Sequence, residues 1–211
     1  MYILHVGVHF VGHPIAQDAL TSLRSRTTPP SLFRRLAHRL SLIVILEATR
    51  DLTLARATVD TPLEPAEGAA LDRDVVVVSV LRAGLGMLDA ALELLPHARV
   101  GHIGLERDEQ TAAASRYYSK LPPLTPTTTV LLVDPMLATG GSAVMAAGLL
   151  TAAGAADLRL LCLVAAPEGL AAFSAAWPDV PIYTPAVDRG LNARKFILPG
   201  LGDFGDRLYG T

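Results

Sequence analysis

The sequence predicts an α/β fold in which a mainly parallel central sheet is flanked by helices. Short runs of strand-forming residues alternate with segments of helical character, which is the pattern of βαβ units. One run, residues 75–78, is continuously β-branched, as is typical of a parallel strand that is covered on both faces. The 211 residues contain no internal repeat and no long linker, so we expect one domain that spans residues 1–211.

Composition excludes several classes of protein. Hydrophobic residues make up 51% of the chain, yet no uninterrupted apolar run reaches the roughly 18 residues of a membrane-spanning helix. The formal net charge of −2 gives no electrostatic argument for a nucleic-acid partner. The first residues have no basic flank and no cleavage pattern, so no secretory signal is expected. Cys162 is the single cysteine, which excludes an internal disulfide and fits a cytoplasmic protein.

The first thirty residues are the hardest to interpret. His5, His9 and His13 are spaced by four, which on a helix would place three imidazoles on one face, as in a metal site. The glycines between them and Pro14 argue against that helix. We therefore expect no metal site in this segment.

A helix is predicted from Ser31 to about Thr49, with leucines at helical spacing and Thr28 as its N-terminal cap. Four basic side chains lie elsewhere on this helix, and we interpret them as a solvated face rather than as a binding patch. They are Arg34, Arg35, His38 and Arg39. Residues 57–72 are rich in proline, glutamate and alanine, and we expect them to form connecting structure.

The rest of the chain is predicted to alternate strands with helices. The expected strands span residues 74–81, 99–105, 130–134, 158–165 and 182–187. The expected helices run from after Met87 to Leu95, from Ala143 to Ala156, and over residues 168–177.

The segment 130–142 is predicted to form a strand, a short loop and the start of a helix. Gly140 and Gly141 stand where the helix begins, and backbone N–H groups at a helix N-terminus favour an anion such as a phosphate. Asp134 ends the strand and suits sugar hydroxyls rather than the phosphate. The pattern therefore indicates a sugar-phosphate site, although an ordinary strand-to-helix turn has similar residues.

Four segments of the predicted sheet should meet beyond the carboxyl ends of its strands, where ligands bind in such folds. They are the segment around Arg82, the segment from Arg107 onward, residues 134–142 and the loop after Val187. Two arginines beside a phosphate loop suit a second, highly charged anion such as a diphosphate. The glycine-rich tail at 197–206 is either a structural loop or a backbone-lined slot for a planar ligand.

Four motifs resemble those of uracil phosphoribosyltransferases, in the same order and with similar separations. They are Leu81–Met87, Asp134–Ser142, Leu163–Gly169 and Pro199–Asp203. The resemblance implies a type I phosphoribosyltransferase fold, with a small hood from the N-terminal segment and about residues 188–211. It also implies transfer of the phosphoribosyl group of 5-phosphoribosyl 1-diphosphate to N1 of uracil in pyrimidine salvage, giving UMP and diphosphate. Mg²⁺ would be held mainly by the diphosphate of the donor, and not by a metal site of the protein.

The resemblance also assigns roles to individual residues. The donor-binding residues that it implies are Arg82, Arg107, Asp134, Pro135, Met136, Leu137, Ala138, Thr139, Gly140, Gly141, Ser142 and Asp203. The residues that it implies for uracil are Ile197, Gly202, Asp203 and Phe204, whose backbone groups would read the edge of the base. Catalytic roles fall to Asp134 at the ribose hydroxyls, to Arg107 at the diphosphate, and to Asp203 as a candidate for assisting loss of the uracil N1 proton.

Two departures from the family pattern concern ligand binding. Phe204 stands where bacterial relatives often carry alanine, and its ring would narrow the slot or pack on the base. Residues 108–116 follow the family's mobile arm only loosely and are rich in alanine. Either change would weaken binding of the base or the donor while the phosphate loop stays intact.

The sequence leaves other functions open. The tail motif argues against a phosphoribosyltransferase for another base, because the base slot is where these enzymes diverge. A nucleotide-sensing regulator that binds RNA should display a basic face, which 18 basic against 20 acidic residues do not demand. The intact phosphate loop and both arginines disfavour an inactive, donor-binding scaffold. The apolar fraction and the resemblance favour a homodimer or a larger homo-oligomer, and GTP, which activates some relatives, is a candidate effector.

Overall fold

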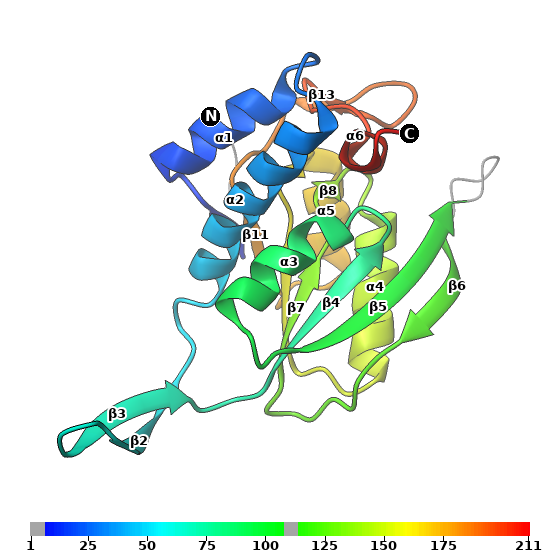
Figure 1. Ribbon diagram of the computed structural model, residues 1–211. Helices are drawn as coiled ribbons and strands as arrows, with labels where there is room; N and C mark the ends of the chain where they lie inside the picture. Colours follow the sequence, from blue (N-terminus) through cyan, green and yellow to red (C-terminus); the bar gives the residue numbers. More distant parts are fainter. Residues whose placement is uncertain (1–6, 108–113) are drawn as a thin grey trace.

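The computed structural model describes residues 7–107 and 114–211. Within these residues the central sheet has seven strands in the order β1-β11-β9-β7-β4-β5-β6 (Figure 1). Neighbouring strands run parallel except for β6, which is antiparallel to β5. The strands are β1 (Val8–Phe10), β4 (Val75–Leu81), β5 (Arg99–Arg107), β6 (Ala114–Lys120), β7 (Thr129–Val133), β9 (Asp157–Leu161) and β11 (Ile182–Thr184). The predicted α/β fold with a mainly parallel sheet is confirmed.

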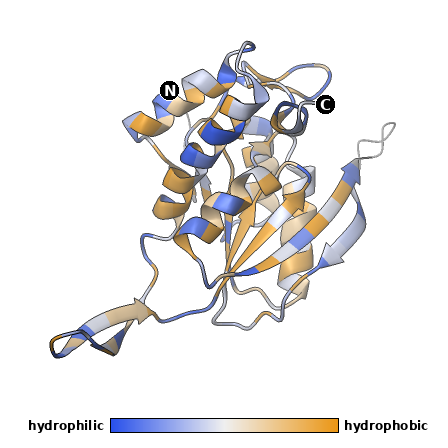
Figure 2. Ribbon diagram, viewed as in Figure 1, coloured by the Kyte–Doolittle hydropathy of each residue, from blue (hydrophilic) through white to orange (hydrophobic). Residues whose placement is uncertain are grey.

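Helices cover both faces of the sheet. One face carries α1 (Pro14–Arg24), α2 (Pro30–Ala48), α3 (Leu85–Leu94) and the short α6 (Phe204–Tyr209), and the other carries α4 (Gly141–Ala152) and α5 (Pro167–Ala176). Val75 and Val77 of β4 pack on the first side, whereas Val76 and Val78 pack on the second. Every residue of this run is therefore buried, and the central strands are hydrophobic along their length (Figure 2). Coverage on both faces explains why the run lacks the alternation of a half-exposed strand.

An antiparallel hairpin of β2 (Leu54–Asp60) and β3 (Pro65–Leu71) projects from the body of the molecule (Figure 1). The expectation of connecting structure over residues 57–72 was therefore wrong. Both strands are mostly exposed, and Leu63 at the tip is 96% exposed. Because neither face of this hairpin is buried, its strands need no alternation of apolar and polar residues, which is the pattern by which strands are recognised in a sequence.

Other boundaries differ from the prediction at specific residues. The helix expected from Ser31 is α2, but Pro29 occupies its N-cap position, and the Thr28 hydroxyl donates to the carbonyl of Ser22 (2.6 Å). The single strand expected over residues 158–165 is divided into β9 and β10 (Val164–Ala165). β10 leaves the central sheet and pairs with β8 (Met136–Leu137). Because of this break, β10 pairs with residues 136–137 of the predicted phosphate loop.

The three N-terminal histidines have separate surroundings. His5 lies outside the described residues; the ring of His9 stacks on Tyr183 with centroids 4.6 Å apart, and Nδ1 of His13 accepts from the Ile15 N–H at the start of α1 (3.2 Å). In the described part of the chain, no group of three or more His, Cys, Asp or Glu side chains could hold a metal ion. Among the helices of residues 7–107 and 114–211, none is long and apolar enough to cross a membrane.

Candidate active site

The predicted phosphate loop connects β7 to α4 at the carboxyl edge of the sheet. Asp134 follows β7 directly, and its N–H donates to the carbonyl of Leu161 in β9 (3.1 Å). Gly140 takes the left-handed conformation (φ +84°) as the N-cap of α4, and it has no side chain to cap the helix. The N-cap residue therefore donates no cap to the first turn of α4, as is typical of helix N-termini that bind anions.

Two glycines outside the loop let neighbouring segments pack directly on it. A Cβ on Gly169 of α5 would lie 2.6 Å from the carbonyl oxygens of both Leu137 and Ala138. A Cβ on Gly84 would lie 2.6 Å from the carbonyl oxygen of Val133, at the end of β7. Because the opposing atoms are backbone, no side-chain movement could relieve these contacts. The glycines of two family-like motifs thus act through close packing.

Arg82 follows β4 and reaches toward the C-terminal helix. Its Nη2 lies 3.6 Å from the carboxylate of Asp206, and its guanidinium carbon lies 5.9 Å from the centroid of the Tyr209 ring. The side chains of the ion pair are 62% and 51% exposed, so the pair contributes little and can be exchanged for a stronger anion.

Arg107 is the last residue of β5, and its backbone pairs with Ala114 of β6. β4 and β5 are neighbouring parallel strands, so the chain leaves both at the same edge of the sheet. Arg82 and Arg107 therefore lie at the ends of adjacent strands, Arg82 just after β4 and Arg107 as the last residue of β5. The alanine-rich arm at 108–116 falls largely outside the described residues, apart from its last residues, which belong to β6.

The residues predicted to bind uracil lie on the segment that joins β13 (Ile197–Leu198) to α6. Ile197 is buried, and its strand pairs with β12 (Gly190–Leu191). Gly202 has a φ of +83°, which suits glycine. Asp203 caps α6, because its Oδ1 accepts from the Asp206 N–H (2.9 Å). This bond fixes the orientation of the Asp203 carboxylate beside the predicted slot.

The Phe204 side chain does not lie in the slot. It is 2% exposed, and its ring meets Phe33 of α2 edge-on with centroids 5.1 Å apart. A Cβ on Gly86 of α3 would lie 2.8 Å from the same ring. The expectation that the ring narrows the slot or packs on the base was wrong, because the ring fills the core between α2 and α3. Only the backbone of Phe204 is left for a ligand.

Sequence reasoning missed two charged residues that hold this C-terminal segment. Asp188 accepts hydrogen bonds from Arg24 of α1 and from the N–H of Gly200. Asp188 belongs to the loop after Val187, which the sequence already places at the carboxyl edge of the sheet. Arg24 had no such signal, because nothing in the first thirty residues indicates what α1 packs against.

Cys162 lies between β9 and β10, beneath the phosphate loop, and is fully buried. Burial raises the pKa of its thiol to about 12; a hydrogen bond with Thr184 opposes the rise, and the negative charge of Asp134 adds to it. The thiol is therefore neutral and unreactive at physiological pH.

The architecture is shared with solved phosphoribosyltransferases. The structure of adenine phosphoribosyl transferase from Trypanosoma brucei aligns with a TM-score of 0.60 over 96% of this chain and 90% of that chain, at 13% identity. At that identity the likeness shows the fold alone. The mainly parallel sheet with helices on both faces is thus the type I phosphoribosyltransferase fold.

Sequence comparison specifies the family within that class. The family model for uracil phosphoribosyltransferase matches residues 10–211. Uracil phosphoribosyltransferases of Agrobacterium fabrum and Dictyoglomus thermophilum are each 48% identical, over 97% and 95% of this chain and 99% and 98% of theirs. The solved AQ2163 protein from Aquifex aeolicus is 34% identical, with a TM-score of 0.93 over 97% of this chain and 98% of its own. The chain belongs to the uracil phosphoribosyltransferase family.

Proposed function

We propose that this chain transfers the phosphoribosyl group of 5-phosphoribosyl 1-diphosphate to N1 of uracil, releasing diphosphate and forming UMP. One observation carries the proposal. The N-terminus of α4, the strand ends that lead to Arg82 and Arg107, and the C-terminal segment 197–204 meet at one edge of the sheet. Membership of the family supports uracil as the base.

Residues 134–142 are proposed to bind the ribose 5-phosphate. The first-turn N–H groups of α4 would donate to the phosphate oxygens, and Thr139 and Ser142 would add hydroxyl donors. Asp134 would accept hydrogen bonds from the ribose hydroxyls, because a carboxylate repels the phosphate but suits hydroxyl donors. The sugar is thereby held by two chemically different ends of one short loop.

The arginines are proposed to act on the leaving group. Displacement at the anomeric carbon builds positive charge on the ribose, as in glycoside hydrolysis, and negative charge on the diphosphate. Arg82 and Arg107 would stabilise that negative charge, which positioned cations do most effectively away from water. Arg82 would exchange its weak contact with Asp206 for the diphosphate.

A magnesium ion carried by the donor fits the residues present. Mg²⁺ favours oxygen ligands, and it commonly keeps substrate phosphates and waters among them. Since the described residues form no cage of three or more His, Cys, Asp or Glu, the diphosphate oxygens would supply most of the ligands. When bound, the ion would neutralise charge on the leaving diphosphate.

Asp203 and its neighbours are proposed to form the base slot under a hood. Backbone groups of Ile197, Gly202 and Phe204 would read the edge of the uracil, and Asp203 would contact the donor and assist loss of the N1 proton. Two contacts support a hood built from the N-terminal segment and about residues 188–211 of a single domain. Arg34 donates to the carbonyl of Leu208 (2.8 Å), and Arg207 donates to the carbonyl of Leu23 (2.6 Å).

We further propose a homodimer or a larger homo-oligomer. The projecting β2–β3 hairpin exposes apolar side chains, including Leu54 (63%), Val59 (52%) and Leu63 (96%). A two-stranded hairpin alone is marginally stable in water, so a second copy that covers these side chains would stabilise it. A monomeric mass in sedimentation at micromolar concentration would contradict this assignment.

Diphosphate release is the measurement that tests the proposed reaction. Purified protein with 5-phosphoribosyl 1-diphosphate and Mg²⁺ should release diphosphate when uracil is added, and not when hypoxanthine or adenine is added. Asp134→Asn is the matched control, since it keeps the volume of the side chain and removes the charge proposed to hold the ribose. The proposal fails if release does not depend on uracil, or if a purine supports it equally well.

A further inference from the structure

The last residue of α1 forms a two-pronged ion pair with the loop that follows β11. Nη1 and Nη2 of Arg24 donate to Oδ2 and Oδ1 of Asp188, each at 2.7 Å. The side chain of Asp188 is only 6% exposed and that of Arg24 is 24% exposed, so water competes little for this pair. A guanidinium that donates two parallel hydrogen bonds to one carboxylate fixes orientation as well as distance.

Both members of the pair also hold the backbone of Gly200. The Gly200 N–H donates to Oδ2 of Asp188 (2.8 Å), and the Gly200 carbonyl accepts from Nη1 of Arg24 (2.8 Å). Gly200 has a φ of +58°, and a Cβ there would lie 2.2 Å from the carbonyl oxygen of Ile197. The turn from Ile197 to Gly202 is therefore tight, and its central residue is bound on both sides by one ion pair.

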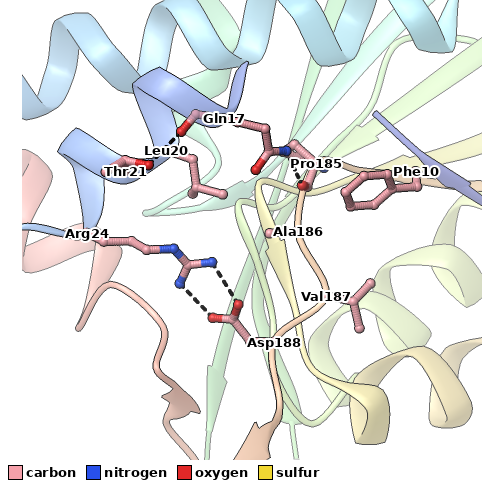
Figure 3. A pocket seen from close by; sticks show the side chains of 9 residues that line it. All are labelled: Phe10, Gln17, Leu20, Thr21, Arg24, Pro185, Ala186, Val187 and Asp188. Atoms are coloured by element: carbon pink, nitrogen blue, oxygen red, sulfur yellow. Dashed lines mark hydrogen bonds and ion pairs between the residues drawn. The ribbon is translucent and has the colours of Figure 1, made fainter. Parts of the chain in front are cut away.

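Figure 3 shows the surroundings of the pair, which lies against a cavity of about 480 Å³ between α1 and residues 185–188. A second polar contact crosses this cavity where the Gln17 amide of α1 donates to the carbonyl of Pro185 (2.9 Å). Gln17 ties the same helix to the same loop as Arg24 does, but its contact is with Pro185 and not with Gly200. The two contacts can therefore be separated by mutation.

We infer that Arg24 and Asp188 are positioning residues for the base slot of the reaction proposed above. They act through Gly200, whose two backbone groups they hold, and they set the places of Ile197 and Gly202 on either side of it. The phosphate loop is a separate segment, built from residues 134–142 and supported by Gly84 and Gly169. The pair should therefore govern the binding of the base and affect the binding of the donor, which residues 134–142 mainly hold, much less. This inference rests on the proposed assignment of residues 197–204 to uracil.

Steady-state kinetics of conservative variants test the inference. Arg24→Lys keeps the positive charge and loses the second prong, and Asp188→Asn keeps the shape and loses the charge. Each should raise the KM for uracil by about tenfold or more, the loss that corresponds to one or two weakened hydrogen bonds. The KM for 5-phosphoribosyl 1-diphosphate and kcat at saturating uracil should stay within about twofold. Gln17→Met, the matched control on the same helix, should leave both KM values within the same limit.

A charge-swapped double variant, Arg24→Asp with Asp188→Arg, distinguishes two roles of the pair. The pair either positions the backbone of Gly200 or only joins α1 to the loop that follows β11. The swap can restore an ion pair, but it places donors against the Gly200 N–H and acceptors against the Gly200 carbonyl. We expect thermal stability to recover relative to the single charge reversals while the KM for uracil stays high. Recovery of both quantities would overturn the inference, and if the double variant does not fold, Arg24→Lys and Asp188→Asn decide the matter.

The outcomes also separate this inference from the proposed reaction. Wild-type protein without uracil-dependent diphosphate release would refute the reaction, and the positioning role with it. Active wild-type protein whose variants change both KM values equally, or neither, would refute the positioning role alone.

Discussion

The two halves of the proposed active site are built in opposite ways. The phosphate loop is one continuous segment, residues 134–142, placed between a strand and the helix that follows it. The base segment at 197–204 depends on residues far away in the sequence, because Arg24 holds Gly200 from 176 residues upstream and Phe33 of α2 packs on Phe204. One half is a local structure and the other is a tertiary one.

This difference follows from the chemistry of the two ligands. A phosphate is recognised by the N–H groups that every helix leaves unpaired at its N-terminus, so a glycine turn before a helix is sufficient. A planar base has no such general partner, and its slot must be held at a defined width by surrounding elements. Changes that loosen the contacts of α1 and α2 with the C-terminal segment should therefore affect the base more than the phosphate.

The largest effect is expected where the phosphate loop meets α5. Gly169→Ala places a methyl group 2.6 Å from two backbone carbonyl oxygens, so α5 or the loop must move. Overpacking of this kind costs about 1–3 kcal/mol of folding stability, or a fall of about 2–12 °C in melting temperature. A displacement near 1 Å at the loop can lower turnover by about a hundredfold. Calorimetry and the diphosphate assay measure the two effects.

Two further glycines serve as controls for Gly169→Ala. Gly148→Ala also adds a methyl group within a helix, but its nearest neighbour would be Trp177 at an ordinary 3.5 Å, so it should keep both stability and turnover. Gly141→Ala places its methyl group 3.9 Å from Thr139 in otherwise open space. It should keep stability and lose turnover, because that space is assigned to the phosphate. Full activity of Gly169→Ala would show that the loop does not depend on close packing of α5.

The second effect concerns the base segment. Gly200→Ala combines the strain of a positive φ with a Cβ only 2.2 Å from the carbonyl of Ile197, so the turn must open. The KM for uracil should rise by about tenfold or more while that for the donor changes little. Gly154→Ala is the matched control, because its φ is also positive (+100°) but its Cβ would be 3.7 Å from the nearest atom. Equal changes in both KM values would contradict a separate base segment.

The parts of the fold that sequence reasoning found are those with a local signal. The buried strand β4, the strand before the phosphate loop and the helix α2 all show an apolar pattern of their own. The β2–β3 hairpin has none, because neither of its faces is covered, and β6 was missed because its sequence is polar and exposed. Within the first thirty residues α1 was not predicted, since it is recognisable only through what it packs against.

The same limit applies to the site. The phosphate loop and the two arginines could be placed at one edge by topology alone. The direction of the Phe204 ring could not be predicted from the sequence, because it depends on the space that Phe33 and Gly86 leave between α2 and α3. The pairing of Arg24 with Asp188 was hidden for the same reason, as 164 residues separate its members.

The smallest effect is expected in the access of a thiol reagent to Cys162. This access tests whether the hood, which carries the base segment, can loosen without exposing the sheet beneath the phosphate loop. The thiol is buried beneath the phosphate loop, and burial raises its pKa to about 12, so it is protonated in the folded state at pH 8. A disulfide reagent should therefore not modify native protein in the time in which it fully modifies protein unfolded in guanidinium. Arg24→Lys weakens contacts of the hood only, so the Cys162 thiol of this variant should stay protected from the reagent. Gly169→Ala disturbs the loop above Cys162 and should shorten that protection. If Arg24→Lys exposed the thiol as quickly as Gly169→Ala does, the hood and the sheet would open as one unit, and the separation between a local phosphate site and a tertiary base site would be lost.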